Sequence, residues 1–358
     1  MEVENLKRAV LPNISFITTV YNEEGNIIEF LKSLMEQTCL PSEIIVVDGG
    51  SKDDTFGITS KFFKYTATLK YRDLKIMLNG NDRGRVKKQK GGKLAVNIRL
   101  IRKAGANISQ GRNEAIKNAS GRIICASDAG CILDRNWLKE ITAFYRDSAC
   151  SVVGGLNMPL CRSFIQKCLA VCIMPAEKEM RATRYMPSSR NISFKREIWT
   201  KTGGYPEDME YGEDMRFNFN IKAAGYKIKF NPSAVVYWKM RENFVQIFKQ
   251  FFRYAKGDAA GGMYPLRHII RFTALLTFLI ILLGAFFFSK WILTVLIPLF
   301  IIYVFRPYAR LIRNPGVKGN CIFSRFEKLL SIPVIPFLLL QIDFSKMCGY
   351  VYGAFRKI

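Results

Sequence analysis

Residues 14–20 read ISFITTV and residues 43–51 read EIIVVDGGS, and these two stretches decide the fold. Between them, residues 26–35 carry apolar side chains at helical spacing. A strand, a helix and a second apolar strand in this order predict a right-handed parallel unit, with the second strand buried on both faces. Strand-like and helix-like patterns continue to alternate to about residue 135, so the N-terminal region is expected to be an α/β domain. Ligands bind at the carboxyl ends of such strands, and binding residues are expected at that edge.

A carboxylate, Asp48, ends the second of these strands, and two glycines follow it. No GxGxxG sequence follows the first strand and the chain has no Walker A loop, which excludes the common dinucleotide and P-loop fingerprints. Asp48 is suited to accept hydrogen bonds from a base N–H or from ribose hydroxyls, and the glycines allow a ligand close to the backbone. An Asp before Gly-Gly is also an ordinary turn sequence, and the pattern alone leaves both interpretations open.

The composition narrows the class of protein. The 358 residues include 54 Lys+Arg and 29 Asp+Glu, a net charge of +25, and 49% are hydrophobic, which excludes a disordered polycation. No nucleic-acid-binding module accompanies the charge, so nucleic acid is not an expected partner. Nine cysteines without a CxxC pair and a single histidine, His268, argue against a disulfide framework and a zinc site, and favour a reducing compartment.

The C-terminal region is far more apolar than the rest. Residues 272–288 and 291–305 are uncharged runs, and they predict a transmembrane or deep re-entrant hairpin over 272–305 rather than a buried pair of core helices. A third apolar run within 329–355 contains two prolines. It either crosses the membrane or lies in the interface, and the sequence leaves both possibilities open.

The distribution of Lys and Arg predicts the orientation of the chain in the membrane and the domain boundaries. The loop 306–328 carries six Lys or Arg and one Glu, so the positive-inside rule places it in the cytoplasm, on the same side as everything before the hairpin. Residues 241–271 contain a basic, aromatic amphipathic pattern that suits a membrane surface, with a core-facing helix as the alternative. We therefore expect a cytoplasmic domain over 1–240, an interfacial segment over 241–271 and a multi-pass membrane region over 272–358.

A series of spaced motifs over about residues 14–257 resembles the family 2 glycosyltransferases of the GT-A fold. The residues that carry the resemblance are TTVYNE (18–23), VDGGSKDDT (47–55), GRNEA (111–115), ASG (119–121), SDAG (127–130), PSSRN (187–191), GGYP (203–206) and GED (212–214). The resemblance implies a mixed, mainly parallel sheet with helices on both faces. It also implies an inverting, hexosyltransferase-type enzyme that uses a nucleoside-diphosphate sugar, with UDP and GDP both possible.

The resemblance also implies roles for individual residues. The donor would be held by the residues that match the family's nucleoside and diphosphate motifs: Thr19, Tyr21, Glu23, Asp48, Ser51, Arg112 and Asp128. Asp214 would be the catalytic base, with Glu213 shaping its pKa or the acceptor site. Acids at these two positions also complement the dipole of a helix N-terminus, which is the simpler interpretation of the pair. Residues 215–223 alternate as in a strand, although the resemblance implies a helix there.

The metal site departs from the family pattern. The usual Asp-x-Asp reads Asp128-Ala129-Gly130 here, the form of a DAG subgroup, and Gly130 removes one carboxylate that would bind Mg²⁺ or Mn²⁺. A metal held by Asp128, water and the diphosphate is expected to bind more weakly. The basic run 83–103 contains no acid and either neutralises a diphosphate or a lipid head group or is a solvated loop.

Residues 250–254, QFFRY, resemble the Gln-x-x-Arg-Trp motif of processive relatives, with Tyr254 in place of Trp. The resemblance puts Gln250, Arg253 and Tyr254 beside the acceptor. The leading hypothesis is a single sugar transfer to a lipid-linked acceptor at the cytoplasmic membrane face, in glycolipid or cell-envelope polysaccharide synthesis. The alternatives are a processive polysaccharide synthase and a catalytically silent membrane protein that binds nucleotide sugars.

Overall fold

The computed structural model describes residues 9–69, 75–78, 96–175, 179–180, 185–313 and 321–355. The chain divides into two compact units, Met1–Asn157 with Arg181–Trp238, and Met158–Met180 with Lys239–Ile358. We call them the catalytic unit and the helical unit. Residues 158–180 thus group with the C-terminal helices, although the sequence-based boundaries include them in the first domain.

The described strands form one nine-stranded sheet in the order β3-β4-β2-β1-β5-β8-β7-β9-β6. Their bounds are β1 (Ala9–Val20), β2 (Cys39–Asp48), β3 (Lys75–Leu78), β4 (Asn97–Arg102), β5 (Ile123–Ala126), β6 (Cys131–Leu133), β7 (Val152–Leu160), β8 (Ile192–Lys195) and β9 (Ile228–Lys239). The half from β3 to β5 is parallel, and β8 joins it antiparallel to both β5 and β7. The predicted α/β class with a mixed, mainly parallel sheet is confirmed.

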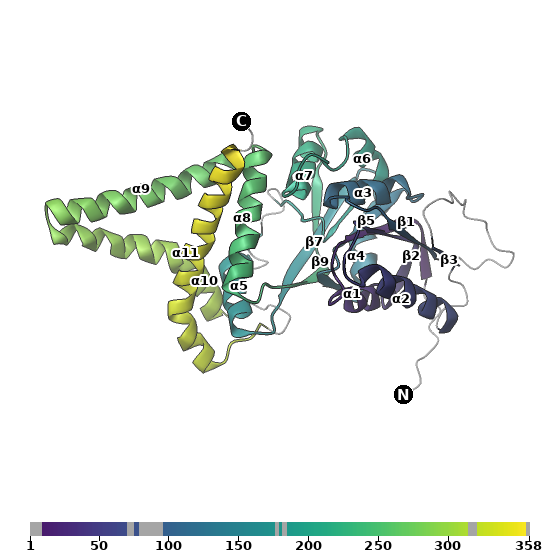
Figure 1. Cartoon of the computed structure of the whole chain (residues 1–358), viewed down its shortest axis with the longest axis horizontal. Helices are drawn as coiled ribbons and strands as arrows, with labels where there is room; N and C mark the ends of the chain where they lie inside the picture. Colours follow the sequence, from purple (N-terminus) through teal and green to yellow (C-terminus); the bar gives the residue numbers. More distant parts are fainter. Residues whose placement is uncertain are drawn as a thin grey trace. The chain divides into compact units, whose positions relative to one another are not determined.

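Helices cover both faces of the sheet (Figure 1). They are α1 (Ile27–Met35), α2 (Thr55–Leu69), α3 (Ile108–Lys117), α4 (Trp137–Thr142), the 3₁₀-helix η1 (Ala143–Arg146), α6 (Arg196–Lys201) and α7 (Glu213–Ala223). Alternation along β1 sends Phe16 into the core beneath α1 and α4, and Ile17 into the core beneath α3 and α7. Each face of the sheet therefore has its own hydrophobic core.

The alternating stretch after residue 212 forms a helix, α7, and not a strand. Its start is Gly212, which has φ 77°, a conformation that favours glycine. Phe217 and Ile221, one helical turn apart, are both buried in the core beneath α7. Two core contacts at helical spacing override the local strand-like pattern.

The helical unit contains α5 (Phe164–Ile173), α8 (Phe244–Ala260), α9 (Pro265–Phe287), η4 (Lys290–Val295), α10 (Leu296–Arg313) and α11 (Arg325–Phe355). Three helical segments, Pro265–Phe287, Lys290–Ile312 and Arg325–Phe355, are long and apolar enough to cross a membrane. Within this unit, α9 and α10 project together as a hairpin, while α8 and α11 lie side by side across its base (Figure 1). The predicted hairpin is thus present as two helices, and its apolar side chains are largely exposed.

Two glycines bring α8 and α11 close together. A Cβ atom on Gly353 would lie 2.7 Å from the backbone oxygen of Lys256, and one on Gly349 would overlap the backbone at Phe252. Glycines four residues apart let two helix backbones approach in this way. The third apolar run is therefore a continuous helix packed along α8, in spite of its two prolines.

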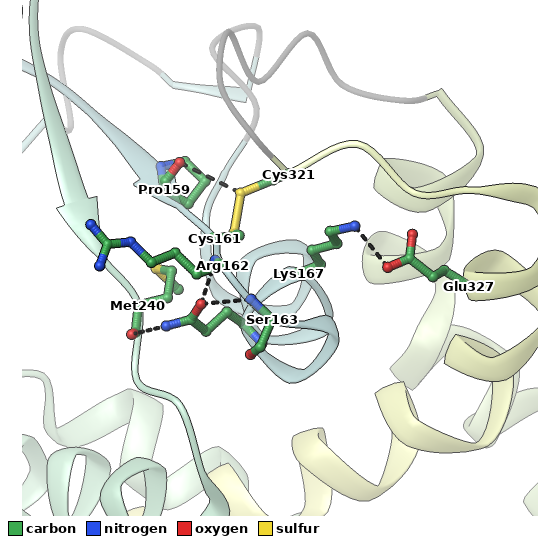
Figure 2. Close-up of a disulfide and its surroundings, with 9 residues drawn as sticks. Pro159, Cys161, Arg162, Ser163, Lys167, Met240, Cys321 and Glu327 are labelled. Atoms are coloured by element: carbon green, nitrogen blue, oxygen red, sulfur yellow. Dashed lines mark hydrogen bonds and ion pairs between the residues drawn. A yellow bond between two sulfur atoms is a disulfide. The ribbon is translucent and has the colours of Figure 1, made fainter.

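One disulfide joins two distant parts of the helical unit. Cys161 and Cys321, which are 160 residues apart, are bonded to each other within the helical unit (Figure 2). The ion pair between Lys167 of α5 and Glu327 of α11, with 2.7 Å between the charged atoms, lies beside it. The sequence argued against a disulfide framework because closely spaced cysteine pairs are missing, and no spacing pattern reveals a single pair that only the fold brings together.

Candidate active site

Asp48 lies at the carboxyl end of β2, in register with Val20 of β1 and Arg102 of β4. Its side chain is 0% exposed. The backbone N–H groups of Gly50 and Ser51 donate to Oδ1 over 2.7 and 2.8 Å, whereas Oδ2 is buried without a partner among the described residues. A buried carboxylate oxygen left without a donor costs free energy, so this atom is suited to receive an N–H or O–H from a ligand.

The first-strand residues surround this end of the sheet. The hydroxyl of Thr19 is buried and has no hydrogen-bond partner in the described chain, and its side chain contacts Gly111 of α3 so closely that a Cβ there would lie 3.0 Å from the hydroxyl oxygen. Tyr21, at 52% exposed, presents its ring to solvent beside Gly49. Thr19 and Tyr21 thus have groups that a ligand could contact.

Ser51 and Glu23 are used inside the protein instead. The Ser51 hydroxyl accepts a hydrogen bond from the backbone N–H of Asn22 over 3.0 Å. The Glu23 N–H donates to Thr55 over 2.8 Å, and the Glu23 carboxylate accepts from Asn26 over 2.8 Å. The Asn22–Ser51 and Glu23–Thr55 bonds fasten the segment after β1 to the segment after β2, so both residues shape the predicted nucleoside site.

Arg112 is the centre of a buried charge cluster. It comes from α3, whose first turn is fixed by a capping box between Asn107 and Gln110. Its guanidinium is 3% exposed and pairs with Asp128 over 2.9 Å and with Glu213 over 2.6 Å. Burial opposes the charge, but the two carboxylates raise the pKa of Arg112 above its ordinary value, so it stays protonated. The structure therefore joins three residues that the resemblance implied separately.

Tyr205 supports this cluster. Its ring lies 5.3 Å from the guanidinium carbon of Arg112, and its hydroxyl hydrogen-bonds to Ser189 over 2.9 Å. Asn113 holds the segment in place, because it donates to the carbonyl of Tyr205 and accepts from its N–H and from the Trp199 ring N–H. Tyr205 and Asn113 lie in the quoted motifs GGYP and GRNEA, but sequence analysis assigned a role to neither.

Glu213 and Asp214 start α7 and have different surroundings. Burial and the charge of Asp214 raise the pKa of Glu213 above its ordinary value, and the contact with Arg112 opposes this shift. Asp214 is partly exposed; its Oδ1 accepts from the N–H of Met215 over 2.8 Å, and no side-chain donor contacts it within the residues that the structure describes. Of the two acids, Asp214 is the one available to a substrate.

Asp128 follows β5, with Oδ1 paired to Arg112 and part of its carboxylate exposed. Gly130 is open, since a Cβ atom there would meet nothing within 4 Å. Space for a second carboxylate therefore exists, and its absence is a property of the sequence and not of packing. In the described ranges no three His, Cys, Asp or Glu side chains gather as a metal site. Asp128 fits a metal only as a single protein carboxylate that leaves the other positions to water and a diphosphate.

The basic run is only partly described. Residues 83–95 lie outside the described residues, while 97–102 form β4. Arg102 donates to the carbonyl of Ser51 over 3.3 Å, and Lys103 pairs with Glu114 over 2.7 Å. The described end of the run thus has partners within the catalytic unit.

Glu43, in β2, has a role that sequence analysis missed. Its carboxylate accepts hydrogen bonds from Ser15, from the hydroxyl and N–H of Ser120 and from the N–H of Gly121. It therefore ties β1 and β2 to the turn before β5. The only signal in the sequence was a charged residue directly before the apolar run 44–47.

The predicted acceptor residues lie on α8 in the helical unit. Gln250 is buried and its amide donates to the Tyr254 hydroxyl over 2.8 Å, one helical turn later. Its amide oxygen is buried and has no partner in the part of the chain described here. Arg253 is exposed and Tyr254 is 39% exposed. The structure brings Gln250 and Tyr254 together, and Arg253 lies on the exposed side of the same helix.

Comparisons with known proteins agree on one family. Residues 15–90 match the model of glycosyl transferase family 2, and residues 131–314, just over half of the chain, match that of glycosyl transferase family group 2. Glycosyltransferase AglE of Haloferax volcanii is 24% identical over 255 residues, 70% of this chain and 74% of the relative. The O-antigen chain rhamnosyltransferase RfbN of Salmonella typhimurium is 22% identical over 237 residues, 62% of this chain and 65% of the relative.

Two further similarities are to a polysaccharide synthase in sequence and to a solved mannosyltransferase structure in fold. A poly-beta-1,6-N-acetyl-D-glucosamine synthase of Staphylococcus epidermidis is 24% identical over 253 residues; the match spans 68% of this chain and 54% of that synthase. Among solved structures, the mannosyltransferase PcManGT from Pyrobaculum calidifontis, in complex with GDP-Man and Mn²⁺, aligns with a TM-score of 0.51 and 17% identity. That alignment covers 96% of this chain and 86% of the other. It supports the same fold.

Proposed function

The chain belongs to glycosyltransferase family 2 and uses a nucleotide-sugar donor, and from this premise we propose an inverting transfer to a lipid-linked acceptor at the cytoplasmic face of a membrane. One observation carries the proposal: the buried side chain of Arg112 forms ion pairs with both Asp128 and Glu213. Because the carboxylate of Glu213 is engaged in an ion pair with Arg112, Asp214 is the one of the two acids that can act as a base. An asymmetric pair of this kind assigns different tasks to two neighbouring carboxylates.

The donor nucleoside is proposed to lie at the carboxyl ends of β1 and β2. Asp48 Oδ2 would accept from the base or from the ribose hydroxyls, which removes the cost of its burial without a partner. The Thr19 hydroxyl would make a second contact, and the exposed Tyr21 ring would cover the base. UDP and GDP both present N–H groups and ribose hydroxyls, so the site accommodates either nucleotide.

In the proposed reaction, the acceptor hydroxyl oxygen forms a bond to the anomeric carbon while the bond to the donor diphosphate breaks. Asp214 receives the hydroxyl proton, and the nucleoside diphosphate leaves; a single displacement of this kind inverts the anomeric centre. General-base assistance of this kind contributes about 10²–10⁴-fold to a rate. Arg112 is already paired with Asp128 and Glu213, so its role would be to hold Asp128 in position beside the departing diphosphate.

A divalent metal, Mg²⁺ or Mn²⁺, is proposed to bind at Asp128 together with water and the donor. When bound, it would neutralise the diphosphate charge. With one protein carboxylate and one oxygen of it already paired with Arg112, the affinity of the free enzyme for metal is expected to be low.

Two features support the membrane part of the proposal. The α9–α10 hairpin is apolar and exposed, and α8 lies across its base with the acceptor motif on it. The basic residues of 306–328 favour the cytoplasm by the positive-inside rule. We propose that the hairpin crosses the membrane and that α8 and α11 lie at its surface.

A processive polysaccharide synthase is the second candidate, and the similarity to a poly-beta-1,6-N-acetyl-D-glucosamine synthase favours it. Tyr254 stands where the processive motif has Trp, and only three described helices could cross a membrane. Product length separates the two candidates, because one added sugar per acceptor excludes a processive synthase.

The test uses full-length protein in nanodiscs made with lipid extract from its host. Labelled UDP- and GDP-sugars are offered with and without a chelator, and label in the organic phase is counted. Asp214→Asn is expected to lower kcat by about 10²–10⁴-fold. The control Asp208→Asn, which changes an exposed acid of the segment before α7, is expected to act as wild type. Undiminished transfer in Asp214→Asn would refute the base assignment, and donor binding without turnover on any acceptor would favour the silent protein.

A further inference from the structure

Six ionisable side chains gather at the base of the hairpin in the helical unit. They are Asp258 of α8, Arg267, His268 and Arg271 of α9, and Asp343 and Lys346 of α11, and we call them the charged layer. Three Lys or Arg side chains face two carboxylates, so with all of these groups charged the layer is net positive even with His268 neutral. Ionisable groups among apolar membrane helices are costly and mark functional sites more often than elsewhere.

Both carboxylates of the charged layer are already engaged. Asp343 pairs with Arg271 over 2.9 Å and accepts from the Tyr303 hydroxyl over 2.9 Å. Asp258 lies 3.0 Å from His268 Nε2. These contacts join α8, α9, α10 and α11, and they leave no carboxylate for the remaining cations.

Among the described residues, Lys346 and Arg267 are the cations of the charged layer that have no ion pair, and Lys346 is the more buried of the two. Its ammonium lies 5.0 Å from the centre of the Phe251 ring, and no described carboxylate is within ion-pair distance. On α11 it lies between Asp343 and Tyr350, whose partners on α9 are Arg271 and His268. Lys346 thus lies between two contacts that hold α9 against α11, close to the start of the hairpin.

His268 supplies a second unsatisfied group. It is 1% exposed, its ring stacks on Tyr350 at 3.9 Å, and Nδ1 is buried without a partner in the described ranges. The charged layer therefore contains a buried polar atom whose hydrogen-bonding capacity is unused among the described residues.

The position of the charged layer along α9 indicates which kind of anion it binds. Arg267, His268 and Arg271 lie in the first two turns of α9, which begins at Pro265, and the long apolar part of the helix follows them. Basic residues at this position in a membrane helix lie where lipid head groups are. We propose that the charged layer binds the phosphate of a membrane lipid, with Lys346 as the main contact. The charged layer belongs to the helical unit, and its occupancy does not require turnover.

The experiment measures lipid retention and not transfer. Full-length protein in mild detergent is given a polyprenyl monophosphate, phosphatidylglycerol or inorganic phosphate, and bound ligand is counted by native mass spectrometry. Lys346→Met keeps the apolar stem and is expected to weaken lipid binding at least about tenfold, the effect of one charge-assisted contact. Lys346→Arg should restore binding, and the control Lys249→Met, an exposed lysine of α8, should bind as wild type.

Each outcome has a defined meaning. Retention of either lipid by wild type, lost in Lys346→Met and restored in Lys346→Arg, supports the proposal, and the lipid retained identifies the source of the phosphate. Equal retention in wild type and Lys346→Met overturns it, as does inorganic phosphate bound as tightly as both lipids. Because lipid is counted without a donor sugar, failure here is distinguishable from failure of the proposed transferase activity.

Discussion

Replacing Arg112 by Met is expected to destabilise the catalytic unit by about 3–5 kcal/mol, the cost of removing one partner from a buried ion pair. The structure supports this size, because the guanidinium is 3% exposed and makes two charge-assisted bonds, each worth about 1.5–3 kcal/mol. Asp128 and Glu213 would be left facing each other without a cation. Arg146→Met, which removes an exposed arginine of η1, is the matched control and should change stability by less than about 0.5 kcal/mol.

Chemical unfolding followed by tryptophan fluorescence measures this loss. Three of the four tryptophans belong to the catalytic unit, and Trp291, 81% exposed after the hairpin turn, is the exception. In a Trp291→Phe background the signal therefore reports on the catalytic unit alone. A loss below about 1 kcal/mol in Arg112→Met would refute the view that Arg112 stabilises the site.

The pH dependence of folding stability provides an independent test of the contact between Arg112 and Glu213. Burial and Asp214 raise the pKa of Glu213, so this carboxyl group favours the folded state at low pH. That contribution is lost as pH rises from the ordinary value, about 4.3, through the raised one. Without Arg112 the pKa of Glu213 rises further, and the variant should lose stability more steeply with pH than wild type. Adding Glu213→Gln should remove the extra slope; an unchanged slope would mean that Glu213 is not the titrating group.

Three further predictions concern other parts of the chain. Asp48→Asn should weaken nucleotide binding about 10–100-fold by calorimetry, because one charge-assisted acceptor is lost; equal affinity would exclude Asp48 from the nucleoside site. Gly349→Val should lower the thermal transition by several degrees because a side chain there meets the α8 backbone, whereas Gly284→Val, with only ordinary contacts, should not. Cys161→Ser should cost up to about 5 kcal/mol on the chain-entropy model for a 160-residue loop. Reductant should lower the transition of wild type to that of this variant and leave the variant unchanged.

The fold of the catalytic unit could be predicted because its signals are local. An apolar run that ends at Asp48 predicts a buried strand and its carboxyl end, and the register of β1 with β2 confirms this strand end. The helix after Gly212 was predicted only through the family resemblance, since alternation along Phe217 and its neighbours pointed to a strand. Packing of Phe217 and Ile221 on one core decided the matter.

What could not be predicted depends on residues that are distant in sequence. Arg112 meets Asp128 and Glu213 across separations of 16 and 101 residues, and no pattern in one sequence predicts that these three share a buried cluster. The partner of Cys161 is equally remote. Long-range pairings of this kind follow from the assembled sheet and helices and not from local propensity.

The bond between Cys161 and Cys321 also changes how membrane sidedness can be measured. It closes the chain into a ring that contains Asp214, α8 and the hairpin, so a single protease cut inside the ring releases no fragment. On a non-reducing gel a nicked molecule would migrate near the intact one, and its pieces would separate only after reduction. Paired gels of protease-treated membranes would therefore report both the exposed loops and the fraction of molecules whose ring is closed in the living cell.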